Sequence, residues 1–302
     1  MAAVTDRRHD RYMDGVPNLD RIRVIVFARI EEALIDPLGA ADEATRSRLA
    51  GLSGQGVAVV ACSGRTRAEI ELMRADLGIE HPFVAEEGAA VFVPRGYFPF
   101  PLPATGIGGG GGYHTLELSI SHEAVLRSLR RVARQARVGV VGFSDMSVGD
   151  VARECGLTLL QARLAKLREY DEPFRVVDHD ASARARLHKA LKANGLHVRP
   201  GPRFDHVVGS ADLGACVATV RGLYARRGPV VTVGVGTGPD DLSFLRRVDL
   251  PVLLQNGSAR GIAPLARTLP SAVVAREGGA AGWFEAVETA IANHRSPAAR
   301  RA

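Results

Sequence analysis

Cysteine and long apolar runs are both scarce in this chain of 302 residues. Its three cysteines, Cys62, Cys155 and Cys216, are too few and too scattered to form a disulfide framework or a zinc site. No apolar run approaches the roughly twenty residues that a membrane span requires. The polar residues 1–20 contain no signal-peptide core. We therefore expect a cytoplasmic protein that has no contact with a membrane.

Lysine and aromatic residues are also rare. Only three residues are lysine (Lys166, Lys189 and Lys192), and every other basic residue behind the net charge of +6 is an arginine. Nucleic-acid-binding proteins usually cluster their basic residues in a recognisable binding module. Here the arginines are spread along the chain, with no aromatic-rich module beside them. We therefore expect a solvated basic surface and no nucleic-acid partner.

Two regions of the chain alternate short apolar strands with helices, which is typical of a parallel, doubly wound sheet. In the first region the sequence predicts strands at residues 23–27, 56–61, 83–84 and 90–93, with helices at residues 41–54 and 65–77. In the last third it predicts strands at residues 230–235, 252–255 and 272–274, with helices at residues 212–226, 240–246 and 282–293. This pattern predicts an α/β fold class with a Rossmann-like core in two sequence pieces.

The alternation stops between these regions. Residues 99–112 are rich in Pro and Gly and end in five consecutive glycines, which is typical of a flexible linker. They lack the preceding strand, the following helix start and the Lys-Ser/Thr pair of a phosphate-binding loop. Beyond them the sequence predicts an α+β insert, with strands at residues 113–120, 175–177 and 197–199 and helices at residues 121–135, 147–155, 159–170 and 181–195.

These patterns predict the domain organisation. The core comprises residues 21–101 and 203–294, and the inserted domain comprises residues 102–202. Residues 1–20 and 295–302 are expected to be mobile tails.

Five segments of the chain together resemble a known family. They are residues 61–70 (ACSGRTRAEI), 82–98 (PFVAEEGAAVFVPRGYF), 168–174 (REYDEPF), 201–206 (GPRFDH) and 234–241 (GVGTGPDD). From residue 21 to about residue 293, the chain is similar to mannosyl-3-phosphoglycerate phosphatases of the haloacid dehalogenase (HAD) superfamily. The resemblance implies a HAD core with a parallel sheet and an inserted α+β cap of the C2 type.

The same resemblance draws attention to the residues that follow the first strand. The family carries Asp-x-Asp-Gly-Thr there, and its first aspartate attacks phosphorus while the second protonates the leaving group. In this chain Arg29 stands at the nucleophile position and Glu31 at the acid position. A guanidinium stays protonated and cannot attack phosphorus. The resemblance therefore implies a phosphatase fold without the phosphatase nucleophile.

Other motif positions are also changed. The family's lysine, which holds the nucleophile and the phosphate, corresponds to Leu213, and its first loop carboxylate, which helps to bind Mg²⁺, corresponds to Thr237. Asp240 stands at the family's asparagine, whereas Asp241 and the phosphate-binding hydroxyl of Ser63 are kept. We expect Arg29 to occupy the metal or phosphate space and to pair with Glu31, Asp240 or Asp241. No metal or cofactor is expected.

The favoured hypothesis is a repurposed or non-catalytic member that binds an anionic sugar- or phosphoglycerate-like metabolite between core and cap. Glu31 and Asp241 are the candidates for any acid–base chemistry. The candidate anion-binding residues are Arg29, Ser63, Arg65, Glu87, Arg168, Glu172, Arg203, His206 and Asp240. For Arg168, Glu172, Arg203 and His206, bracing of the cap explains the residue type equally well. Glu86 and Glu87 either line the pocket or cap a turn.

Two alternatives stay open. The first is an active Mg²⁺-dependent phosphatase that acts on mannosyl-3-phosphoglycerate or a relative, with Asp241 as a ligand of Mg²⁺ and a water as nucleophile. The second is a regulatory protein that binds a protein partner through an exposed apolar patch.

Overall fold

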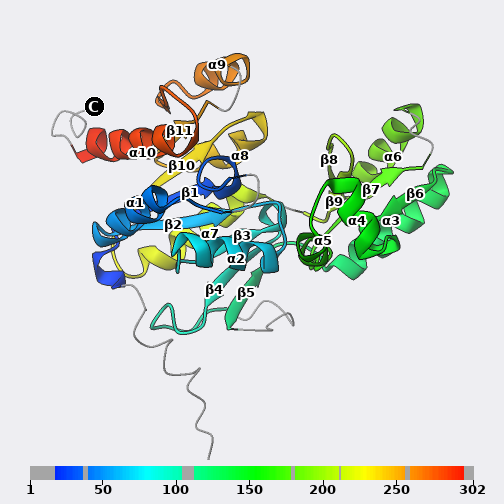
Figure 1. Ribbon diagram of the computed structural model, residues 1–302, viewed down its shortest axis with the longest axis horizontal. Coiled ribbons are helices and arrows are strands. Elements are labelled where there is room, and N and C mark those ends of the chain that lie inside the picture. Colours follow the sequence, from blue (N-terminus) through cyan, green and yellow to red (C-terminus); the bar gives the residue numbers. More distant parts are fainter. Residues whose placement is uncertain are drawn as a thin grey trace, which may run out of the picture.

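The computed structural model describes residues 18–36, 40–103, 112–177, 181–210, 212–255 and 259–295. It contains an eight-stranded sheet and a four-stranded sheet, which build two parts that lie beside each other (Figure 1). This arrangement confirms the predicted α/β core with an inserted α+β cap. Residues 104–111 of the predicted linker and most of the two predicted tails lie outside the described residues.

The large sheet forms the centre of the core. Its strands from one edge to the other are β12 (Val273–Val274), β11 (Leu250–Leu253), β10 (Val231–Gly236), β1 (Val24–Arg29), β2 (Val57–Cys62), β3 (Phe83–Ala85), β4 (Ala90–Pro94) and β5 (Tyr113–Glu117). Neighbouring strands run parallel from β12 to β3, and β4 and β5 are antiparallel to their neighbours. The chain reverses its direction of winding at β1, because β10 lies on one side of this strand and β2 on the other.

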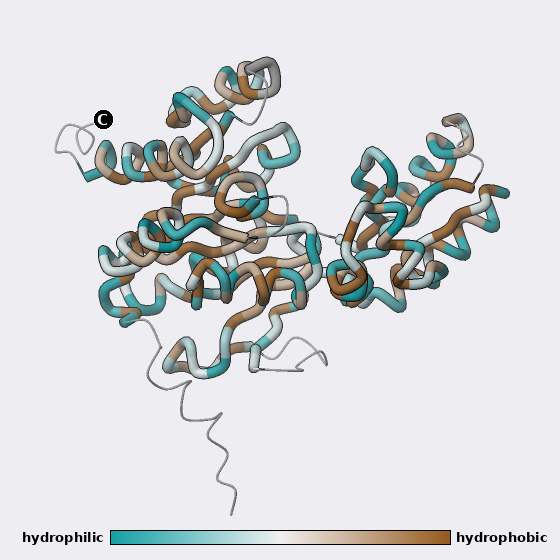
Figure 2. Tube along the Cα trace, in the orientation of Figure 1, coloured by the Kyte–Doolittle hydropathy of each residue, from teal (hydrophilic) through white to brown (hydrophobic). Residues whose placement is uncertain are grey.

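Helices cover both faces of the large sheet. One face packs against α1 (Glu43–Gly54), α2 (Arg67–Leu77) and α10 (Gly279–Arg295), and the other packs against α7 (Leu213–Ala225), α8 (Leu242–Leu245) and α9 (Ala259–Thr268). Strand β1 is buried on both faces, because Val24 and Val26 point to the first helix layer and Ile25 and Phe27 point to the second. Apolar residues accordingly run through the central strands (Figure 2). Helix α9 was not predicted from the sequence.

Helix α2, predicted over residues 65–77, has a defined cap at each end. The Thr66 side chain accepts from the backbone N–H of Glu69, and the Glu69 carboxylate accepts from the N–H of Thr66, which is a capping box. Gly78 ends the helix with φ 66°, the left-handed conformation that glycine adopts at low cost. This cap fixes the start of α2 directly after the loop that carries Ser63 and Arg65.

The smaller sheet belongs to the cap. Its strand order is β6 (Val140–Gly142), β7 (Asp171–Val176), β9 (Asp205–Val208) and β8 (His197–Arg199), and all of its neighbouring strands are antiparallel. Helices α3 (His122–Ala136) and α6 (Ala181–Ala193) pack on this sheet in one apolar cluster. Helices α4 (Val148–Cys155) and α5 (Leu159–Ala165) form a second cluster with Phe143 and Phe204.

Several predicted boundaries differ from the structure. Strand β5 pairs with β4 in the core sheet, so the Pro/Gly-rich connection before it joins two core strands and does not join core to cap. Strand β9, which was not predicted, pairs with β7 in the cap. By sheet membership the cap therefore begins after residue 117 and ends at residue 208, instead of at 102 and 202. The predicted helix 159–170 ends at Ala165, and β7 begins at Asp171, earlier than the predicted strand 175–177.

None of the helices in the part of the chain that the structure describes is long and apolar enough to cross a membrane.

Candidate functional site

Arg29 lies at the carboxyl end of the central strand β1, where the chain changes its direction of winding. Ligand sites of open α/β sheets usually lie at this edge and at this switch point. The Arg29 side chain is only 8% exposed and forms two ion pairs. Its Nε donates to Asp241 Oδ1 at 2.8 Å, and its Nη2 donates to Glu87 Oε2 at 2.9 Å. A permanent positive charge is therefore buried at the edge of the core that faces the cap.

Asp241 is the first partner of Arg29 and confirms one of the three predicted pairings. It ends η6 (Pro239–Asp241), the short 3-10 turn that follows β10. Its second carboxylate oxygen accepts the backbone N–H groups of Thr237 at 2.8 Å and Gly238 at 3.2 Å. Both oxygens of this buried carboxylate are therefore engaged, one by Arg29 and one by its own loop.

Glu87 is the second partner of Arg29, and it was not among the predicted ones. It lies in η4 (Glu86–Gly88), the turn between β3 and β4. Its other oxygen, Oε1, accepts a hydrogen bond from Nη1 of Arg199 at the end of the cap strand β8. One carboxylate therefore connects Arg29 of the core with Arg199 of the cap. Arg199 also lies 3.7 Å from the carboxylate of Asp240, which is 74% exposed.

Glu86 has a structural role in the same turn. Its carboxylate accepts the backbone N–H groups of Glu169 at 2.9 Å and of Tyr170 and Asp171 at 2.7 Å each, which lie where the chain enters β7. Burial, and after it the charge of Asp171, raise the pKa of Glu86 well above its usual value, while Arg168 and the backbone donors act in the opposite direction. Of the two predicted roles for Glu86, the structure supports the capping of a turn.

Glu31, another of the predicted partners of Arg29, accepts a hydrogen bond from a neighbouring loop. Ser63 Oγ donates to Glu31 Oε1 at 2.6 Å and accepts from the backbone N–H of Arg65 at 3.0 Å. The other oxygen of Glu31, Oε2, is buried and has no hydrogen-bond partner among the described residues. Burial raises the pKa of the Glu31 carboxyl, although the Ser63 hydrogen bond and the charges of Arg29 and Arg65 oppose the rise.

Arg168 and His206 meet at Asp171 on the first residue of β7. Arg168 Nη1 donates to the carbonyl of Gly64 at 2.8 Å and to Asp171 Oδ1 at 3.0 Å, so this cap residue holds the core loop after β2. His206 Nδ1 lies 2.7 Å from Asp171 Oδ2. Burial opposes the charge of Asp171, but Arg168 and His206 outweigh it and lower the pKa to about 2.

Glu172 is placed differently from the prediction. Adjacent residues of a strand point to opposite sides, and Glu172 points away from the side of Asp171. It lies 2.6 Å from His122 Nε2 and accepts from the backbone N–H of Ser144 at 2.8 Å and from its hydroxyl at 2.9 Å. Glu172 lines neither of the two cavities described next. These contacts support the bracing of the cap, the alternative role expected for Glu172.

A cavity of about 580 Å³ lies between core and cap. Five arginines and three glutamates contribute to its wall: Arg29, Arg65, Arg168, Arg199, Arg203, Glu31, Glu69 and Glu87. Arg65 and Arg203 approach it from the core and from the cap, respectively. Arg65 makes one long hydrogen bond, to Glu69 Oε1 at 3.3 Å, and Arg203 donates through Nη1 to the backbone carbonyl of Glu154. The wall therefore has an excess of positive charge.

A second cavity, also of about 580 Å³, lies on the other side of the Arg29–Glu87–Arg199 bridge. These three residues, with Pro200 and His206, line both cavities. The rest of the second wall is acidic or neutral, with Asp171, Asp212, Asp240 and Leu213 among its residues. The bridge therefore stands in the middle of one continuous cleft with a basic half and an acidic half.

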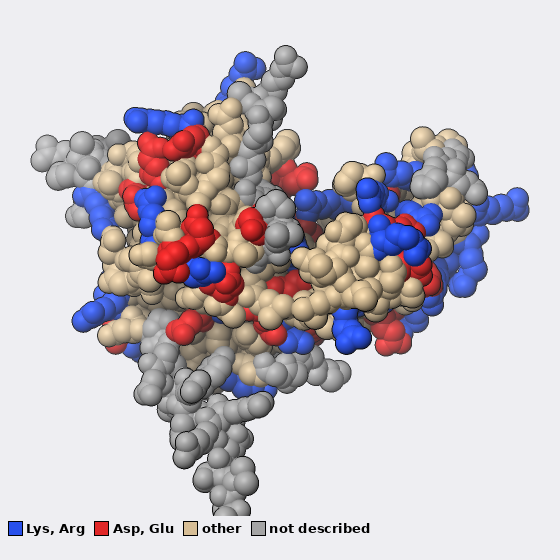
Figure 3. Space-filling view, in the orientation of Figure 1, with Lys and Arg blue, Asp and Glu red and all other residues tan. Residues whose placement is uncertain are grey.

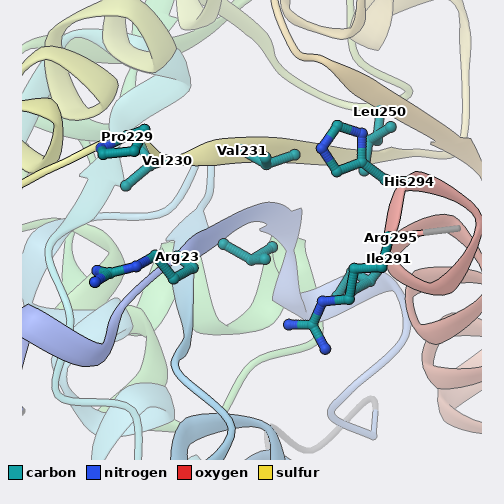
Figure 4. Close-up of a pocket in the computed structure, with 9 residues that line it drawn as sticks. Arg23, Pro229, Val230, Val231, Leu250, Ile291, His294 and Arg295 are labelled. Atoms are coloured by element: carbon teal, nitrogen blue, oxygen red, sulfur yellow. The ribbon is translucent and has the colours of Figure 1, made fainter. Parts of the chain in front are cut away.

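The basic half agrees with the charge distribution on the molecular surface. On the face shown in Figure 3, lysine and arginine side chains gather over the cap, whereas the core shows both signs. A smaller hollow of about 270 Å³ lies far from this cleft, at the amino ends of β1, β10 and β11 and the carboxyl end of α10 (Figure 4). Its labelled residues, including Arg23, Leu250 and His294, do not belong to any of the sequence motifs.

Comparison with known proteins identifies the family. No family model matches the chain. A glucosyl-3-phosphoglycerate/mannosyl-3-phosphoglycerate phosphatase from Methanococcoides burtonii is 32% identical over 232 residues, which cover 76% of this chain and 84% of the relative. The chain belongs to this phosphatase family. A mannosyl-3-phosphoglycerate phosphatase from Pyrococcus horikoshii is 28% identical over 225 residues, covering 74% of this chain and 88% of the relative.

Solved structures show that this member of the family has the HAD fold. A haloacid dehalogenase-like hydrolase from Bacteroides thetaiotaomicron matches with a TM-score of 0.61 at 14% identity, covering 90% of this chain and 99% of that one. A HAD subclass IIB sugar phosphatase matches with a TM-score of 0.55 at 14% identity, covering 90% and 98%. At these identities the matches establish the fold alone, and this fold agrees with the predicted HAD core and cap.

The structure brings most of the predicted site residues of this family member to one cleft. Arg29, Glu31, Glu87, Arg168 and His206 line it, as do Arg65, Arg203 and Asp240. Ser63 and Asp241 lie directly behind it, bonded to Glu31 and Arg29. Sequence reasoning missed Arg199 and Asp171. Asp171 lies within the segment 168–174 that resembles the family, so this motif could have identified it as a site residue. Arg199 lies between two such segments, so no sequence motif pointed to it.

Proposed function

We propose that this family member binds an anionic sugar- or phosphoglycerate-like metabolite between core and cap, and that it does not hydrolyse phosphate esters through an aspartyl nucleophile. The observation that carries the proposal is the buried guanidinium of Arg29 at the end of β1, paired with Asp241 and Glu87. In this proposal Arg29 stands where the phosphatases carry their nucleophile. A guanidinium keeps its proton and has no lone pair to offer phosphorus.

The neighbouring positions support the same proposal. Leu213 starts α7 as a buried apolar residue, at the position that the family fills with a lysine. Asp241 and Glu87 each direct a carboxylate oxygen to Arg29, at 2.8 and 2.9 Å. Glu31 accepts a hydrogen bond from Ser63, and its burial raises the pKa and so favours the protonated form, which has no carboxylate charge with which to attack. Of these three carboxyl groups, two are therefore engaged by Arg29 and the third by Ser63.

The arrangement also does not fit Mg²⁺. This hard cation needs several oxygen ligands, and the described residues contain no group of three or more His, Cys, Asp or Glu side chains that could hold a metal ion. The guanidinium of Arg29 already neutralises Asp241, so a divalent cation at this carboxylate would meet a positive charge at close range. In the proposed function Arg29 provides the positive charge at this point, and no step passes through a metal.

An anion would be held by arginines from both sides of the cleft. Arg65 belongs to the core and Arg203 to the cap; Arg65 donates through Nη1 to Glu69, and Arg203 donates through Nη1 to the carbonyl of Glu154. Their remaining N–H groups can donate to phosphate or carboxylate oxygens, and guanidinium groups bind such oxygens in pairs. Glu31 also lines this cavity, and its buried Oε2 has no hydrogen-bond partner among the described residues. Burial favours the protonated form of this carboxyl, and in that form Oε2 can donate one further hydrogen bond.

Isothermal titration calorimetry in EDTA tests the proposal with inorganic phosphate, 3-phosphoglycerate and mannosyl-3-phosphoglycerate as ligands. We expect at least one of them to bind the wild-type protein without metal. The double variant Arg65→Gln/Arg203→Gln should bind at least about tenfold more weakly, because it removes the two guanidinium groups that would hold the anion. A tenfold loss of affinity corresponds to roughly 1.4 kcal/mol of binding free energy.

The matched control is Arg127→Gln, which removes an arginine of the exposed pair with Glu123 on α3 and should leave the affinity unchanged. Binding that requires Mg²⁺, or binding that is insensitive to Arg65 and Arg203, would contradict the proposal. A lack of response to every anion would favour a function in binding a protein partner.

A further inference from the structure

The carboxylate of Glu87 is placed as a bound ligand would be. It lies between the guanidinium groups of Arg29, at the end of β1, and Arg199, at the end of β8. These groups are separated by the core–cap interface, and all three residues line both halves of the cleft. A carboxylate that bridges two guanidinium groups in the middle of a ligand cleft occupies the most favourable anion position there.

The backbone of Glu87 is held in a conformation that side-chain-bearing residues rarely adopt. Glu87 has φ 61°, and Glu86 before it has φ 48°. Such residues persist only when their surroundings hold them, and they concentrate at functional sites and switch regions. Glu86 is held by its three hydrogen bonds to the entry of β7. The backbone N–H of Glu87 donates to the carbonyl of Ser63 at 3.1 Å, and its carboxylate contacts Arg29 and Arg199. Loss of the two arginine contacts would therefore release the side chain while the backbone contact remains.

The charges around this position favour one class of anion. Asp241 is bonded to Arg29, and Asp240 lies 3.7 Å from Arg199, so a carboxylate already accompanies each arginine. Exchange of Glu87 for the carboxylate of a ligand leaves the charge between Arg29 and Arg199 unchanged. A phosphate dianion in the same place would add a further negative charge there. The planar fork of a guanidinium also matches a carboxylate in geometry.

We propose that Arg29 and Arg199 form a carboxylate-binding subsite, which Glu87 fills when the cleft is empty and from which a carboxylate-bearing, glycerate-like ligand displaces it. This inference rests on the proposed function and adds the chemical class of the ligand group at that subsite. The displaced Glu87 side chain moves off the bridge, and the ligand carboxylate then connects core and cap in its place. The wild-type affinity for the ligand is lowered because the ligand competes with an intramolecular carboxylate.

Titration of D-glycerate and of inorganic phosphate into wild-type protein and Glu87→Gln tests the proposal. The glutamine has nearly the same shape but no charge, so it competes weakly for the arginines. We expect the affinity for D-glycerate to rise about tenfold or more in Glu87→Gln, and the affinity for phosphate to change by less than about twofold. Adding Arg199→Gln to Glu87→Gln should remove the gain, while the control Glu123→Gln should behave as wild type.

One result of this titration would overturn the inference. An unchanged or lower affinity of Glu87→Gln for D-glycerate would mean that Glu87 only positions the arginines. If Glu87→Gln does not fold, Glu87→Asp replaces it, because the shorter side chain keeps the charge but does not span both guanidinium groups, and the same gain is expected.

The proposed function and this inference fail in different ways. If no anion binds wild type or Glu87→Gln, both are wrong. If phosphate binds through Arg65 and Arg203 while glycerate binding ignores Glu87, only the inference is wrong.

Discussion

Arg29 illustrates how one residue can be recognised from the sequence while its surroundings cannot. Its position after a buried strand, together with the resemblance to a phosphatase family, indicated an ion pair with Glu31, Asp240 or Asp241. This was correct for Asp241, because the carboxyl ends of neighbouring parallel strands meet at one edge of the sheet. The contact with Glu87 depends on the left-handed backbone of the β3–β4 turn. Two consecutive glutamates do not predict this conformation, because glycine is the residue that usually adopts it.

Removal of the Arg29 charge should destabilise the protein strongly. In Arg29→Met the carboxylates of Asp241 and Glu87 lose their buried partner, and breaking a buried pair in this way typically costs about 3–5 kcal/mol. Urea unfolding followed by circular dichroism measures the free energy of unfolding. Arg127→Met, in an exposed pair, should cost no more than about 1 kcal/mol.

A triple variant checks the cause of this loss. Arg29→Met/Asp241→Asn/Glu87→Gln removes the two unpaired charges together with the arginine and should recover much of the lost stability. A loss of less than about 1 kcal/mol in Arg29→Met would show that the two ion pairs do not hold this part of the core.

At the scale of elements, the turn η4 connects the core to the cap through its backbone as well as its side chains. Glu86 accepts three backbone N–H groups at the entry of β7, and Glu87 contacts Arg199 at the end of β8. Gly88, with φ 93°, follows them, and a Cβ there would lie 2.8 Å from the backbone nitrogen of Leu213. The turn therefore packs closely between the cap and the start of α7.

Glu86→Ala should loosen this connection. The three amide groups of residues 169–171 would lose their acceptor, and each buried donor left unsatisfied costs about 1–3 kcal/mol. We expect amide hydrogen exchange to accelerate in a peptide that covers residues 166–174, while a peptide that covers β1 exchanges as slowly as in wild type. Glu123→Ala is the control on an exposed helix face. Unchanged exchange at residues 169–171 would show that Glu86 is not their anchor.

Most elements, but not their sheet partners, were predictable from the sequence. The apolar runs of β1, β2 and β10 and the last residue of α2 were correctly predicted, because burial on both faces and helix caps are local signals. The membership of β5 and β9 was not predictable, since a short strand does not specify which sheet edge it joins. The predicted strand began at residue 175, whereas β7 begins at Asp171, so the sequence could not show the face of the sheet to which Glu172 points.

At the scale of the whole molecule, two separately packed domains place charged residues on both sides of one cleft. The core sheet ends in Arg29, and the cap contributes Arg168, Arg199 and Arg203. The family relationship extends over most of the chain, 76% in the alignment with the Methanococcoides burtonii phosphatase. In this member of the family, a guanidinium lies at the end of the central strand, where that strand meets the cleft between core and cap.

A phosphate-release assay with glucosyl-3-phosphoglycerate and mannosyl-3-phosphoglycerate in excess Mg²⁺ tests the central claim most directly. The phosphatase from Methanococcoides burtonii serves as the positive control. We predict no release above the level of heat-denatured protein, because Arg29 cannot act as the nucleophile. Release that depends on Mg²⁺, stops with EDTA and follows the folded protein through purification would contradict the account.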